Sequence, residues 1–255
     1  MRSGEPAQRR DRILIGAGLA AATAACWLWI VPMARDMYGP MSGPSAWMMA
    51  ATWDLRFVIL LWAMWAVMMA GMMLPSASPM VLLYAGVLRR GPDAGRTTSR
   101  VWIMVGGYLL VWVLFSAAAT VLQRILSGLL LITPMMETAS PKAGGIVLLV
   151  AGAYQWTPLK ATCLRACRSP LSFIMQHWRA GASGAFRMGL DHGRYCLGCC
   201  WALMLLLFVG GVMNLWVIAT LTLFVLVEKV APFGSYSSRV AGVALIGLGV
   251  WMVVR

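Results

Sequence analysis

One stretch of nine residues gathers three cysteines and a histidine, the side chains that soft-metal chemistry needs. If this stretch is helical, His192, Cys196 and Cys200 recur every four residues and share one face. Cys199 lies one turn beyond Cys196, on nearly the same face. Thiolate and imidazole together are good ligands for Zn(II), and sulfur-rich sets also suit Cu(I). The spacing indicates a metal site, and packing of small apolar cysteines is the competing interpretation.

A second pair of cysteines follows the predicted fourth apolar span. Cys163 and Cys167 are four residues apart, and we expect them at the same face of the membrane as the first group. Cytosolic thiols are normally reduced, which favours metal binding or catalysis over disulfides. We expect the nearby Arg165, Arg168 and Arg194 to favour thiolate formation. Whether the two groups form one site is left open.

Methionines form the other unusual pattern. Met64, Met68 and Met72 recur every four residues within a predicted span, and Met69 and Met73 make an adjacent row. Thioethers are soft ligands that favour Cu(I) and offer little to hard cations. The competing interpretation is ordinary packing of a helix in an apolar core.

Polar groups inside the apolar runs must find partners. Pro75 removes a backbone donor from its helix, so the carbonyl near Gly71 needs another hydrogen bond. We expect Glu228 to be the counter-ion of Lys229 or Arg239 at the inner end of a span, and a supporting partner of His192 is the alternative.

Composition determines the class of protein that carries these residues. Hydrophobic residues make up 61% of the 255 residues and charged residues 11%, against roughly 45–50% and 25% in soluble domains. Long apolar stretches recur along the whole chain, which predicts a single integral membrane domain over 1–255. The net charge of +13 is spread over short segments between the apolar runs, which argues against nucleic acid as a partner.

The fold class that follows is all-α, a polytopic transmembrane bundle of about seven spans, since a span needs about 20 apolar residues. The predicted spans are Ile13–Met33, Phe57–Leu88, Val101–Leu122, Gly144–Leu159, a hairpin of two within Cys196–Val227 turning near Gly210, Gly211 and Asn214, and Val240–Val254. The distribution of Lys and Arg places the N-terminus inside. Residues 1–12 are then a cytoplasmic tail and 160–195 a basic cytoplasmic loop, in a multi-pass protein of the bacterial inner membrane.

Several of these segments together resemble a known family. They are Met72–Ser76, Tyr154–Lys160 with Cys163 and Cys167, and Gly189–Trp201. They are similar to an uncharacterised bacterial family of predicted metal-binding integral membrane proteins, domain of unknown function 2182. The resemblance covers most of the chain from about residue 55 onward. It implies a polytopic membrane protein with a metal role and no settled substrate.

These observations favour a protein that handles a soft transition metal, with copper as Cu(I) preferred and Zn(II) as the alternative. Binding, delivery and transport are all open. The expected partners are the lipid bilayer, the metal ion and periplasmic or membrane proteins. An enzyme is disfavoured. The alternatives are a membrane thiol oxidoreductase that uses Cys196 and Cys199, and an accessory or assembly subunit with a structural zinc site.

Overall fold

The computed structural model describes the chain except for residues 1–4, 40–41, 44, 50–52, 92–93 and 134–135. The described part is mainly helical, has no β-strand and contains one isolated β-bridge, between Ile132 and Thr138. Its helices are α1 (Glu5–Met37), η1 (Ala46–Met49), α2 (Leu55–Leu88), η2 (Ala94–Arg96), α3 (Thr97–Gly128), α4 (Pro141–Tyr154), α5 (Pro158–Arg168), α6 (Pro170–His177), α7 (Gly181–Met204), α8 (Leu207–Gly210), α9 (Leu215–Val230) and α10 (Gly234–Val254).

The predicted class, an all-α polytopic membrane bundle, is confirmed. Five helical segments of the described chain are long and apolar enough to cross a membrane, and they are Arg12–Met37, Leu55–Leu88, Ala94–Gly128, Gly181–Gly210 and Gly234–Val254. The remaining two predicted spans correspond to α4, with 14 residues, and α9, with 16. Both are shorter than the roughly 20 residues of a straight span.

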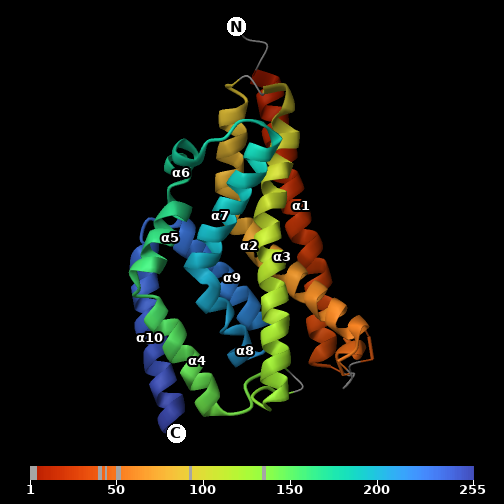
Figure 1. Ribbon diagram of the computed structural model, residues 1–255, viewed down its shortest axis with the longest axis vertical. Coiled ribbons are helices and arrows are strands. Elements are labelled where there is room, and N and C mark those ends of the chain that lie inside the picture. The colour runs from red at the N-terminus through yellow and green to blue at the C-terminus, as the bar shows by residue number, and fades with distance from the viewer. Residues whose placement is uncertain (1–4, 40–41, 44, 50–52, 92–93, 134–135) are drawn as a thin grey trace.

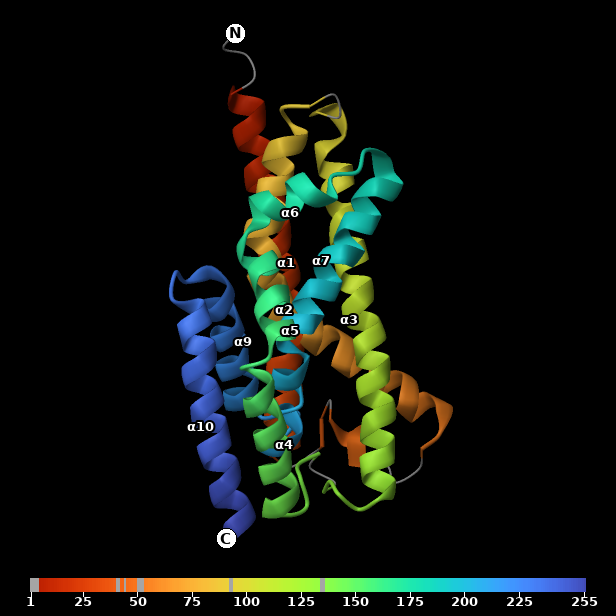
Figure 2. The ribbon, with the colours of Figure 1, turned by 60° about the vertical axis from the view of Figure 1, so that its left-hand side comes forward.

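The long helices pack side by side in the order α1, α2, α3 and α7 (Figures 1 and 2). The closest pair is α3 with α7, and glycines make this approach possible. A side chain at Gly107 would collide with the backbone of Phe186, and one at Gly189 with the backbone of Met104. Small residues at such crossings let two membrane helices bring their backbones together.

Helices α4 and α10 form a second close pair at the other side of the bundle (Figure 2). Gly145 and Gly152 of α4 face the backbone of Gly249 and Gly242 of α10. Helix α9 packs on α10 and on α2, so it joins this pair to the long helices. The C-terminal ends of α4 and α9 and the start of α10 therefore meet in one region, beside α5 and α7.

Helix α2 stays continuous through Pro75 and Pro79 and bends along its length (Figure 1). The two carbonyls that these prolines leave free both find donors. The indole Nε1 of Trp27 donates to the Gly71 carbonyl at 3.2 Å, and Ser78 Oγ donates to the Pro75 carbonyl at 2.7 Å. The expected need for a partner near Gly71 is confirmed.

The segment from 160 to 215 differs most from the expected layout. The range 160–195 holds most of α5, all of α6 and the first half of α7, so the cysteines of α7 lie inside a helix that begins at Gly181. The predicted turn is found where expected: Gly211 has φ of +92°, and the Asn214 side chain caps α9 by accepting from the Trp216 amide.

Candidate metal centre

Helix α7 holds its cysteines inside the protein because glycines let two neighbouring helices cover it. Gly193 packs against α3, and Gly198 packs against Cys163 of α5. A side chain at Gly193 would collide with Val111, and one at Gly198 would collide with the sulfur of Cys163. The three cysteines of α7, which are Cys196, Cys199 and Cys200, are fully buried. His192, one turn before Cys196, is 4% exposed.

The sulfur of Cys196 contacts polar groups from two other helices, α9 and α3. Lys229 Nζ of α9 donates to Cys196 Sγ at 2.8 Å and to Ser76 Oγ of α2 at 3.1 Å. The hydroxyl of Tyr108, on α3, lies 3.1 Å from the same sulfur and 3.2 Å from the Met73 carbonyl oxygen. An ammonium group in contact with sulfur favours the thiolate, which is the form that binds metal.

A second buried lysine lies close by and is differently paired. Lys160 Nζ forms an ion pair with Glu228 Oε1 at 2.7 Å, and both side chains are almost fully buried. The expectation that Glu228 pairs with Lys229 or Arg239 is therefore wrong. The two residues are adjacent in α9, and adjacent residues point in different directions on a helix, so Glu228 faces α5 while Lys229 faces α7.

The three arginines expected near the thiols have other partners. Arg168 donates to the carbonyls of Ala231 and Pro232, both at 2.8 Å. Arg165 donates to the Thr162 hydroxyl, and Arg194 lies 3.5 Å from Asp191. The cation in contact with the α7 sulfurs is Lys229.

The second cysteine pair does come together with the first. The Cys167 thiol of α5 interacts with the Cys199 thiol, which in turn interacts with those of Cys196 and Cys200. We call these four residues the thiol cluster. Cys163 lies against Gly198 at its edge. The sixth cysteine, Cys26, is apart from them on α1 and packs near Gly71.

His192 lies beside the thiol cluster with one nitrogen uncommitted. Its ring packs against Tyr108 and Phe173, with centroid separations of 5.5 and 5.3 Å. Its Nδ1 is buried and has no hydrogen-bond partner in the described chain. A buried polar atom without a partner is unusual and marks a position where a ligand can bind.

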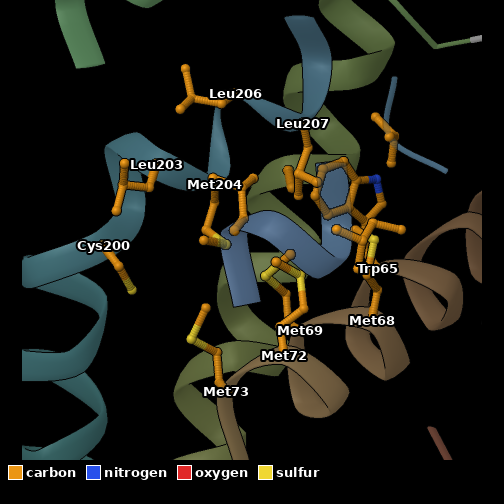
Figure 3. Close-up of a cluster of buried hydrophobic side chains, with 14 of the residues drawn as sticks. Trp65, Met68, Met69, Met72, Met73, Cys200, Leu203, Met204, Leu206 and Leu207 are labelled. Carbon is orange, nitrogen blue, oxygen red and sulfur yellow. The ribbon is translucent and has the colours of Figure 1, made fainter. Parts of the chain in front are cut away.

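The predicted methionine pattern faces the interior of the bundle. Its members, which we call the thioether row, are all fully buried: Met64, Met68, Met69, Met72 and Met73. They share one core cluster with the cysteines of α7. Figure 3 shows Met69, Met72 and Met73 pointing toward Met204 and Cys200. Ordinary apolar side chains, among them Trp65 and Leu207, fill the space around them (Figure 3).

The sulfur atoms approach each other pairwise. Among the described residues, no three His, Cys, Asp or Glu side chains are arranged so that they could enclose a metal ion together. A structural Zn(II) site takes four such ligands in a tetrahedron.

A pocket of about 330 Å³ lies between α5, α6 and α7, next to the buried site. Its lining includes Arg165, Phe173, His177 and Tyr195. The ring of Phe173 contacts His177 on one side, at 4.4 Å between centroids, and His192 as well. One aromatic side chain thus borders both the pocket and the face of α7 that carries His192.

Two residues of this site, Tyr108 and Ser76, were not singled out from the sequence. Each is a polar residue inside an apolar helix, and such residues are functional candidates by default. The sequence shows that these residues are polar and lie inside apolar segments, but it does not show which sulfur each hydroxyl faces.

A family model described as PpoB2, copper chaperone, matches residues 62–252. The matched range contains the thiol cluster, the thioether row, His192 and Lys229. No match is found among curated proteins or among solved structures.

Proposed function

This chain belongs to the PpoB2 copper chaperone family, and we propose that it holds its copper as Cu(I) between Cys196 and Cys199. The observation that carries the proposal is the thiol cluster itself. Helix α7 buries the sulfurs of Cys196, Cys199 and Cys200 beside a buried ammonium group, and Cys167 of α5 reaches Cys199 from a second helix. Thiolates are soft ligands and select Cu(I) over hard cations.

The position of Cys167 supports a role in moving the ion. Its thiol interacts with Cys199 from a different helix. A third sulfur beside Cys199 lets Cu(I) exchange one ligand at a time, so that the ion is never released into an apolar core. His192, whose Nδ1 has no partner, is the nitrogen ligand available on the same face.

The thioether row of α2, which shares a buried core with the thiol cluster, supplies weaker ligands. Thioethers are neutral, so they hold a cation less firmly than thiolates do. We propose that Cu(I) passes along Met72, Met73 and Met204 on its way to or from Cys200. Neutral ligands give such a passage without burying additional charge.

Delivery requires a way out of the protein. The pocket beside Phe173 supports an exit at the α5–α6 side, because rotation of that single ring would connect His192 to His177. The receiving partner is then a protein or small thiol on the side of the membrane that α6 faces. We place that side in the cytoplasm of a bacterium, with the N-terminus inside and the protein in the inner membrane. The resemblance to domain of unknown function 2182 stays a prediction.

Metal analysis tests the proposal. Protein purified under reducing conditions is expected to carry stoichiometric copper, and the triple variant Cys196→Ser, Cys199→Ser, Cys200→Ser is expected to lose it. Cys26→Ser is the matched control, because this cysteine lies apart from the cluster and should leave copper content unchanged. Equal copper in the triple variant and the wild type would exclude the thiol cluster as the binding site.

A further inference from the structure

The interior of the protein contains an excess of positive charge where the sulfurs meet. Lys160, Glu228 and Lys229 are all buried, with exposures of 1%, 0% and 7%. Lys160 and Glu228 neutralise each other at 2.7 Å. Among the described residues Lys229 forms no ion pair with a carboxylate, and it contacts Cys196 Sγ and Ser76 Oγ instead. Buried charges are stable only when paired, so the partner of Lys229 must come from the sulfur site.

The sulfur site supplies a matching negative charge when it holds monovalent copper. Two thiolates carry two negative charges and Cu(I) carries one positive charge, so the bound complex has a net charge of minus one. The thiol protons that are displaced leave to solvent. The ammonium of Lys229, 2.8 Å from Cys196 Sγ, then makes the buried site neutral. A divalent ion on the same two thiolates would leave one uncompensated positive charge.

We propose that Lys229 is a specificity-determining residue that selects monovalent copper over divalent metals through its fixed positive charge. The proposal rests on the proposed function, because it takes Cys196 and Cys199 as the ligands. Lys229 does not bind the ion. It acts through space on the net charge that the site tolerates, and in a low-dielectric interior such an effect is strong.

The geometry explains why the charge of Lys229 acts on the sulfur site and the charge of Lys160 does not. Lys160 is held by Glu228, so its charge is cancelled before any metal arrives. Lys229 is fixed by the hydroxyl of Ser76 on α2 and faces the sulfur from α9, opposite α7. Its ammonium group therefore stays beside the ligands.

The ratio of two affinities tests the proposal. Cu(I) affinity is measured by competition with a chromogenic Cu(I) chelator, and Zn(II) affinity with a zinc-binding dye, on the full-length protein in detergent. Lys229→Met is expected to weaken Cu(I) binding by about 100-fold, as for loss of one partner of a buried charge pair. Zn(II) binding should stay equal or become tighter. Lys229→Arg keeps the charge and should keep the wild-type ratio.

Two more variants separate charge from folding. Lys229→Gln retains a hydrogen-bond donor but has no charge, so it should show the same change of ratio even if Lys229→Met folds poorly. Ser78→Ala removes the hydrogen bond to the Pro75 carbonyl on the same helix and leaves Lys229 and its partners in place, so its ratio should match the wild type. If both neutral variants lose Cu(I) and Zn(II) affinity equally, or lose neither, the proposal is wrong. Wild-type protein that binds no Cu(I) would instead overturn the proposed function.

Discussion

The thiol cluster and the thioether row lie next to each other in one buried core, yet they are stabilised in different ways. Around the thiol cluster, the Tyr108 hydroxyl and the Lys229 ammonium group contact the sulfur of Cys196, and the ion pair of Lys160 with Glu228 connects α5 to α9. Around the thioether row the neighbours are apolar side chains. One region depends on matched charges, and the other depends on packing.

This difference matches what each kind of sulfur can do. A thiolate is charged, so it binds a cation firmly and needs compensation when it is buried. A thioether is neutral and flexible, so it fits an apolar core without any polar partner. In the proposed function, the thiol cluster holds copper and the thioether row lets it pass.

Removing one charge from the ion pair should be severe. Glu228→Gln leaves Lys160 buried without a counter-charge, and breaking such a pair typically costs about 3–5 kcal/mol. The free energy of unfolding in detergent, measured by chemical denaturation, reports the loss. The double variant Lys160→Met, Glu228→Leu removes both charges and should recover most of the stability. A single variant as stable as the wild type would mean that this pair is hydrated and that the region does not depend on matched charges.

The two cysteines of α5 should differ in their effect on copper. Cys167 interacts with Cys199, whereas Cys163 lies against Gly198. Cys167→Ser should therefore weaken Cu(I) binding at least about tenfold, the loss typical even of an outer-shell partner. Cys163→Ser should leave the affinity close to the wild-type value. Competition with a Cu(I) chelator measures both. The reverse order of effects would mean that the ion sits between Cys163 and Cys199 instead.

Much of the fold could be predicted, because apolar length is a local property of the chain. The turn at Gly211 and Asn214 and the need for a donor near Gly71 also follow from single residues. The start of α7 could not be predicted. Charged residues such as Arg187 and Arg194 interrupt the apolar pattern there, yet the helix runs through them, and its Gly189 packs against α3.

The candidate site was predictable in its parts and not in its assembly. The spacing of Cys196, Cys199 and Cys200 places them together because a helix repeats locally. The contact between Cys167 and Cys199, and that between Lys229 and Cys196, join different helices. No pattern within one segment reports such a contact. This is why the arginines near the thiols in sequence were expected to be their cations, and Lys229, 33 residues away from Cys196, was not.

The smallest effect on stability should come from the thioether row. Met72→Leu conserves volume, and such swaps in a core usually cost less than about 1.5 kcal/mol. Copper content at equilibrium should be unchanged because the thiol cluster is intact. Loading should become slower, since one soft ligand of the passage is lost. Stopped-flow measurement of Cu(I) uptake checks the rate, with Val67→Ile on the same helix as the control for a purely apolar change. A Met72→Leu protein that loads copper at the wild-type rate would mean that this methionine only packs, and the contrast between the two regions would then concern stability alone.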